Sequence, residues 1–128
     1  MRRVALRLKR VYDAIEPDDG IRVLVTYYWP RGIPKTSVDR WYRALGTPPA
    51  LLKPWQQGKV PRDRFVSLYR TAVETEEARG LIRELAALAR EQTVTLLTSF
   101  RDLQHSHLPI LRQLIEEEAS RLAPKPPS

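Results

Sequence analysis

The alternation of apolar and polar residues near the start of the chain predicts a β-strand. Val4, Leu6 and Leu8 alternate with smaller or charged neighbours, a period of two that is typical of a half-buried strand at the edge of a sheet. Two later runs, residues 21–27 and 94–98, are almost continuously apolar and rich in β-branched residues. Such runs are typical of strands buried on both faces, so we expect both in the interior of a sheet.

Between and after these runs, apolar residues recur at helical spacing. The pattern predicts helices beginning near Thr36, Pro49, Pro61, Thr75 and Pro109, all residue types that favour the start of a helix. Gly46 is expected to end the first. The apolar faces of the five helices are formed, in chain order, by Val38, Trp41, Tyr42 and Leu45; Leu51, Leu52 and Trp55; Phe65, Leu68, Tyr69, Ala72 and Val73; Ala78, Leu81, Ile82, Leu85, Leu88 and Ala89; and Leu111, Leu114, Ile115 and Leu122.

Strands separated by helices predict an α/β fold. We expect a small domain of two or three layers, in which a few mostly parallel strands are covered by about five helices. The 128 residues allow one domain, expected over residues 1–122, followed by a disordered proline-rich tail at 123–128. No run is apolar enough to cross a membrane, and the basic N-terminus is not a secretory signal, which favours a cytoplasmic protein.

Each of the two long apolar runs breaks into a cluster of polar, aromatic and basic residues. Trp29-Pro30-Arg31-Gly32 forms a corner after the first, since Pro30 cannot donate to a ladder and Gly32 permits positive φ. Parallel strands that are neighbours end at the same edge of a sheet, so we expect the two clusters to meet. The facing side chains are predicted to be Thr26, Tyr28 and Arg31 from the first, and Ser99, Arg101, Asp102, Ser106 and His107 from the second.

The residue types of this candidate site favour an anion. Arg31 and Arg101 would supply bidentate donors suited to phosphate or carboxylate, and the helix beginning near Pro109 would add free backbone N–H groups. Thr26, Ser99 and Ser106 complete the predicted anion-binding set, and His107 is the candidate catalytic residue, as a proton donor or acceptor.

Each residue also has a structural alternative. Arg31 can form an ion pair within the fold, and Asp102 or Ser106 can cap the last helix. His107 can bond a backbone carbonyl, and the three tryptophans, Trp29, Trp41 and Trp55, are more often core residues than stacking platforms.

Composition narrows the chemistry further. The chain has no cysteine and only two histidines, and it lacks the phosphate-loop, dinucleotide and metalloprotease motifs, so we expect no metal and no cofactor. The net charge is +7, and residues 1–70 hold 15 Lys and Arg against 6 Asp and Glu. This excess permits a nucleic acid as partner, with these residues as the contact set: Arg2, Arg3, Arg7, Lys9 and Arg10.

Several motifs, in a fixed order, are similar to those of a known family. They are Lys9-Arg10-Val11-Tyr12-Asp13, Asp19-Gly20, Arg22-Val23-Leu24-Val25, Trp29-Pro30-Arg31-Gly32, Thr95-Leu96-Leu97 and His107. In these motifs the chain resembles the YeaO-like family, a bacterial domain of unknown function. The resemblance spans about residues 8–122 and implies a small α/β domain of the bacterial cytoplasm, with no substrate attached.

The chain departs from the pattern of that family within the candidate site. Thr26 and Tyr27 stand where the family usually has Asp and Arg, and Ser106 stands where it usually has Asn. Three hypotheses therefore stay open. The protein binds a small anionic molecule at the strand ends, with or without catalysis; it binds nucleic acid or acts as a regulator through its basic half; or it is a non-catalytic interaction protein that has lost an ancestral activity. The oligomeric state is left open.

Overall fold

In the computed structural model, which describes residues 4–122, four parallel strands form one sheet in the order β1-β4-β2-β3. Their bounds are β1 Leu6–Arg10, β2 Ile21–Leu24, β3 Arg40–Trp41 and β4 Val94–Thr98. Val94 is opposite Leu6 on one side and Ile21 on the other, so β4 is an interior strand. The α/β class, the parallel sheet and the edge position of β1 are confirmed.

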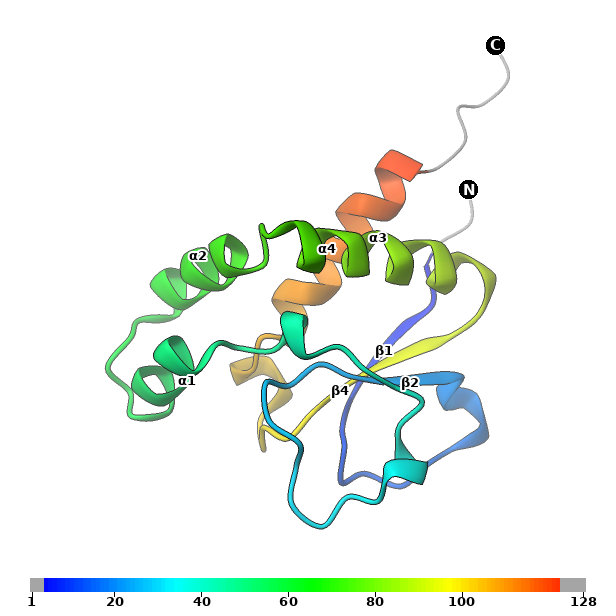
Figure 1. Ribbon diagram of the computed structural model, residues 1–128, viewed down its shortest axis with the longest axis horizontal. Coiled ribbons are helices and arrows are strands. Elements are labelled where there is room, and N and C mark those ends of the chain that lie inside the picture. Colours follow the sequence, from blue (N-terminus) through cyan, green and yellow to red (C-terminus); the bar gives the residue numbers. More distant parts are fainter. Residues whose placement is uncertain (1–3, 123–128) are drawn as a thin grey trace.

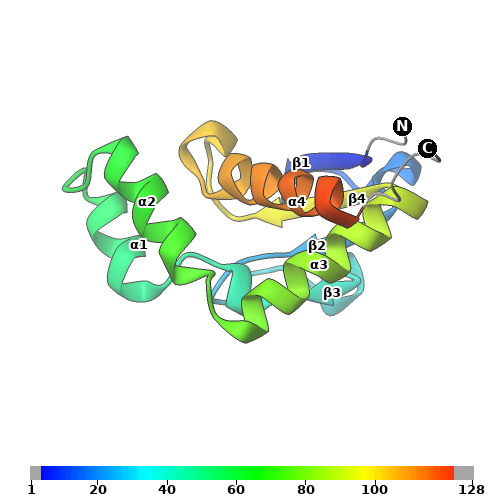
Figure 2. The same cartoon turned by 90° about the horizontal axis from the view of Figure 1, so that it is seen from above.

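In the described residues, four α-helices accompany this sheet, and two of them cover one of its faces (Figure 1). The four helices are α1 Pro49–Gln56, α2 Arg62–Ala72, α3 Glu76–Glu91 and α4 Leu108–Leu122. Helices α3 and α4 lie next to each other across the strands, and α1 and α2 form a pair at one end (Figure 2). Val23, Val25 and Leu96 point into the apolar core that these helices share.

The other face of the sheet is covered by connecting segments rather than by helices. Leu24 and Leu97, one residue along from Val23 and Leu96, pack there against Trp29, Ile33 and Val38. The described part of the chain therefore has two layers, and the alternation of side chains along β2 and β4 explains why both strands are apolar throughout.

The prediction of a helix from Thr36 to Leu45 is wrong. This segment forms a 3₁₀ turn at Lys35–Ser37, strand β3 and a second 3₁₀ turn at Arg43–Leu45, so the described residues contain four α-helices instead of about five. The Asp39 N–H donates to Arg22 O and the Tyr42 N–H donates to Leu24 O, both backbone groups of β2. Pairing with a distant strand thus outweighs the local helical spacing of the apolar residues.

Two other expectations differ from the structure at helix surfaces. Leu68 and Leu122, both predicted to be buried, are 38% and 39% exposed. Helix α2 buries the side that carries Phe65 and Tyr69, and Leu122 lies at the very end of α4. Strand β2 also ends at Leu24, three residues earlier than predicted.

Two remaining expectations concern membrane-spanning helices and the proline-rich tail. No helix among residues 4–122 is both long enough and apolar enough to cross a membrane. The proline-rich tail predicted at 123–128 lies outside the described residues.

Candidate functional site

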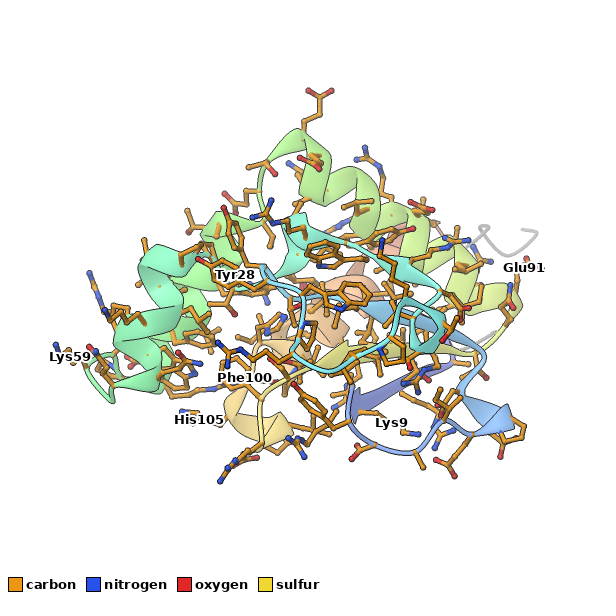
Figure 3. All side chains as sticks on the ribbon, turned by 60° about the horizontal axis from the view of Figure 1, so that its bottom comes forward. Lys9, Tyr28, Lys59, Glu91, Phe100 and His105 are labelled. Carbon is orange, nitrogen blue, oxygen red and sulfur yellow. The ribbon has the colours of Figure 1, made fainter. Side chains whose placement is uncertain are left out.

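The segments that follow β2 and β4 come together at the carboxyl end of the sheet. The two strands pair in parallel from Ile21 opposite Val94 to Leu24 opposite Leu97, and the Val25 N–H extends the ladder to Leu97 O. The predicted adjacency of these two strand ends is confirmed. In Figure 3 the labelled Tyr28, Phe100 and His105 lie near one another at this end, away from Glu91.

A small cavity of about 60 Å³ lies between these segments. Its walls come from four parts of the chain, listed here in order: Thr26, Tyr27 and Tyr28 after β2; Thr47 before α1; Leu52 and Gln56 of α1; and Ser99, Phe100 and His107 between β4 and α4. A shallower groove of about 430 Å³ adjoins it and shares Gln56, Ser99 and Phe100. The cavity therefore has room for one compact chemical group, and the groove for a larger body attached to it.

The structure brings some of the predicted site residues together and separates others. Thr26, Ser99 and His107 line the cavity, and Arg101 lines the adjoining groove. Arg31 lines neither of them.

Arg31 follows Trp29, which packs on the face of the sheet opposite the helices, and its exposed backbone oxygen accepts a hydrogen bond from Tyr12 Oη at 3.2 Å. The predicted corner is present, with Gly32 at φ 74° and the Trp29 indole N–H donating to Ile33 O at 2.9 Å. Arg31 itself is absent from the walls of both the cavity and the groove, so the expected pair of guanidiniums is not part of these walls.

Ser106 caps the start of the last helix, as its structural alternative proposed, whereas Asp102 caps the short 3₁₀ turn before that helix. Asp102 Oδ1 accepts from the Gln104 N–H at 3.0 Å at the start of the 3₁₀ turn Leu103–His105. Ser106 Oγ accepts from the Leu108 N–H at 3.1 Å and donates to Leu103 O at 2.6 Å, and the residue is fully buried. Ser106 thus fixes the loop before α4, and its hydroxyl is already used.

His107 is the only titratable group with a strongly shifted pKa among the cavity walls in the described chain. It is 1% exposed, and its ring packs against Tyr69 at 5.3 Å between centroids. The pKa of His107 is lowered to about 4, chiefly by burial; the nearby charge of Arg62 also lowers it, and the hydrogen bond to Val25 O opposes these two effects. His107 is therefore neutral at pH 7.

The hydrogen bond of His107 also fixes which ring nitrogen bears the proton. Nε2 lies against Val25 O, and because a carbonyl only accepts, Nε2 must carry the hydrogen. Nδ1 of the neutral ring then has a free lone pair. Within residues 4–122, His107 Nδ1 and Thr47 Oγ1 are buried side-chain atoms without a hydrogen-bond partner, and both residues line the cavity.

Aromatic stacking holds the loop that carries His107. The Trp55 ring lies between His105, at 4.1 Å, and Phe65, at 4.2 Å, and its indole N–H donates to His105 O at 2.8 Å. Arg62 Nη1 donates to Ser106 O at 3.2 Å. These contacts tie the loop to α1 and α2, so the cavity is formed by parts of the chain that are held in place. Trp55 is thus a core residue, as expected from its structural alternative, rather than a platform on which a ligand stacks.

Several residues that line the cavity were not predicted from the sequence. Thr47 and Gln56 belong to the segment around α1, far from both strands along the chain, and no pattern links them to the strand ends. Phe100 follows Ser99 directly in the polar segment after the second apolar run. An apolar side chain in a polar segment was the feature that could have indicated its place in the cavity wall.

Much of the basic charge near the N-terminus is used inside the fold. Lys9 Nζ contacts both oxygens of Asp19 at 3.1 Å, and Arg7 and Arg22 also contact that carboxylate. Burial opposes the charge of Asp19, but hydrogen bonds from the Glu16 N–H and from its cationic partners outweigh it and lower the pKa.

Arg10 Nε donates to Phe100 O at 3.0 Å, while Arg2 and Arg3 lie outside the described residues. The nucleic-acid hypothesis stays a prediction. Across residues 4–122, no three His, Asp or Glu side chains gather in a way that could hold a metal ion.

Comparison with known proteins places these features in a family. Residues 5–128 match the model of the family described as the inactive DUF488-N3 subclade. The chain is 34% identical to the uncharacterized protein YeaO of Escherichia coli (strain K12) over 108 residues, which covers 83% of this chain and 92% of that protein.

It is also 36% identical to the uncharacterized protein Rv3073c of Mycobacterium tuberculosis (strain ATCC 25618 / H37Rv) over 118 residues, covering 90% of this chain and 97% of the relative. No solved structure matches. The resemblance to YeaO-like proteins is confirmed.

Proposed function

Because this chain belongs to the inactive DUF488-N3 subclade, we propose that it is a non-catalytic binding domain that takes a small ligand at the carboxyl ends of β2 and β4. The observation that supports the site is the cavity with two buried, unpartnered polar atoms, His107 Nδ1 and Thr47 Oγ1. Buried polar groups in folded proteins nearly always have a partner, so such a pair in one cavity points to a bound group.

The cavity walls favour binding over catalysis. None of the described residues that line it is Asp, Glu, Lys or Arg, so a paired acid and base is missing from the walls. His107 donates Nε2–H to a backbone carbonyl and resists protonation, which makes it a poor proton shuttle. Thr26 stands where the YeaO-like pattern has an Asp, and its hydroxyl donates to Tyr28 O at 2.6 Å.

A fragment screen tests the proposal directly. The probes are small amides, alcohols, carboxylates and inorganic phosphate, each measured for its effect on the thermal midpoint and mapped by amide chemical shifts. At ten times its Kd a ligand stabilises the native state by about 1.4 kcal/mol, which corresponds to a rise of about 5 °C in the thermal midpoint for a chain of this size.

Ser99→Trp provides a variant with the cavity blocked. Ser99 is exposed and lies on both the cavity and the groove, so the added indole obstructs the site without entering the core. Ser67→Trp, on the exposed surface of α2, is the matched control. We expect hits to stabilise the wild type and Ser67→Trp but not Ser99→Trp. If no probe shifts signals around the cavity, or if hits stabilise Ser99→Trp equally, the proposal is wrong.

A further inference from the structure

The two unpartnered atoms of the cavity indicate which class of ligand it binds, because they differ in whether they can donate or accept a hydrogen bond. His107 Nδ1 accepts only, since the ring proton is on Nε2 against Val25 O. Thr47 Oγ1 is a hydroxyl oxygen, which can both donate and accept. A group seated between them must therefore present at least one N–H or O–H to His107.

An anionic group that lacks an N–H or O–H, such as a carboxylate, does not meet this requirement. A carboxylate or phosphate oxygen would place its lone pairs against the lone pair of Nδ1, and it would lose hydration among walls that include Leu52 and Phe100. Protonating His107 to receive an anion is also costly, because the ring is 1% exposed and Arg62 already adds positive charge nearby.

We propose that the group bound in this cavity is an uncharged hydrogen-bond donor, most simply a carboxamide, whose N–H is accepted by His107 Nδ1 and whose carbonyl is met by the Thr47 hydroxyl. This inference rests on the proposed function and names its ligand class. The cavity of about 60 Å³ takes a group of this size, while the rest of the ligand lies in the groove along Phe100, Asp102 and His105. Arg101, in that groove, is the residue available to an anionic substituent outside the cavity.

Three molecules of nearly equal shape distinguish the donor requirement from simple size. Acetamide has both a donor and an acceptor, acetone has only an acceptor, and acetate is an anionic acceptor. Each is titrated into uniformly ¹⁵N-labelled protein while the imidazole nitrogens of His107 and His105 are observed. His105 is exposed and lines the groove but not the cavity, so it is the internal reference for binding outside the cavity.

We expect acetamide to shift the His107 Nδ1 signal saturably toward lower frequency, and acetone and acetate to bind at least about fivefold more weakly, the loss expected for one neutral hydrogen bond. Thr47→Val removes the hydroxyl at nearly constant volume and should weaken the binding of acetamide by about the same factor. The substitution itself should shift the thermal midpoint of the free protein by no more than ligand binding does. Thr47→Ser, which keeps the hydroxyl, should restore the affinity.

Each alternative result overturns the inference. Tighter binding of acetate than of acetamide would identify an anion site and leave the proposed function standing. Equal binding of acetone and acetamide would show that shape alone selects the ligand. No response of the His107 Nδ1 signal to any of the three molecules would show that the cavity holds only water. Failure of the whole fragment screen, by contrast, removes the proposed function itself.

Discussion

Stability between neutral and mildly acidic pH should depend on one histidine, His107. Its pKa is lowered to about 4 in the folded protein from an ordinary value of 6.5. Between these two values the unfolded chain binds more protons than the folded one, so the free energy of unfolding falls as the pH falls. From pH 7 to about pH 5 the loss assigned to this group is about 2 kcal/mol. Below the folded pKa the loss is complete and no longer grows.

Urea denaturation of three proteins at the two pH values measures this contribution. His107→Gln keeps an N–H donor for Val25 O but has no titration, so its stability should fall by about 2 kcal/mol less than that of the wild type over the same interval. His105→Gln removes the other histidine, which is exposed, and should behave as the wild type does. The reasoning is refuted if His107→Gln loses as much stability as the wild type, or if His105→Gln abolishes the pH dependence.

Two further predictions concern the turn before β2. Asp19→Asn removes the buried carboxylate that contacts Lys9, Arg7 and Arg22, and should lower the free energy of unfolding by about 3 kcal/mol, measured in urea. The exposed Asp18→Asn should change it little, and equal effects of the two substitutions would contradict the importance of the buried cluster. Gly20→Ala should lower the thermal midpoint clearly more than Gly32→Ala. Both glycines have positive φ, at 62° and 74°, but a Cβ at Gly20 would overlap the Thr93 backbone oxygen, whereas Gly32 has open space. Similar midpoints for the two variants would show that the turn relaxes.

Local patterns were sufficient for most elements of the fold. Strand β4 has the bounds that its apolar run predicted, and Thr75 is the cap of α3, with its side chain accepting from the Ala78 N–H. The period of apolar residues reports which side of an element is buried, and this information lies within a few residues of each position. The interior position of β2 and β4 followed from the same reasoning, because both runs are apolar on both faces. Their adjacency was a separate expectation, which the pairing of the two strands confirms.

The segment around β3 shows where that reasoning fails. Thr36 and Asp39 have the spacing of a capping box, and the apolar residues that follow have helical spacing. The chain is extended there instead, since its backbone N–H groups bond to β2 and the Trp41 indole N–H donates to Thr26 O at 2.8 Å. Those partners lie about 15 residues or more away, beyond the reach of a local pattern.

For the candidate site, the residue patterns predicted the correct edge of the sheet and four of the residues that line the cavity, Thr26, Tyr28, Ser99 and His107. The folded chain adds Thr47 to the cavity walls, leaves Arg31 out of them, and makes His107 neutral with a free lone pair. The physical reason is that hydrophobic periodicity is a local property of the chain. Burial, hydrogen-bond partners and protonation depend instead on neighbours contributed by distant segments, and these are known only when the chain is folded.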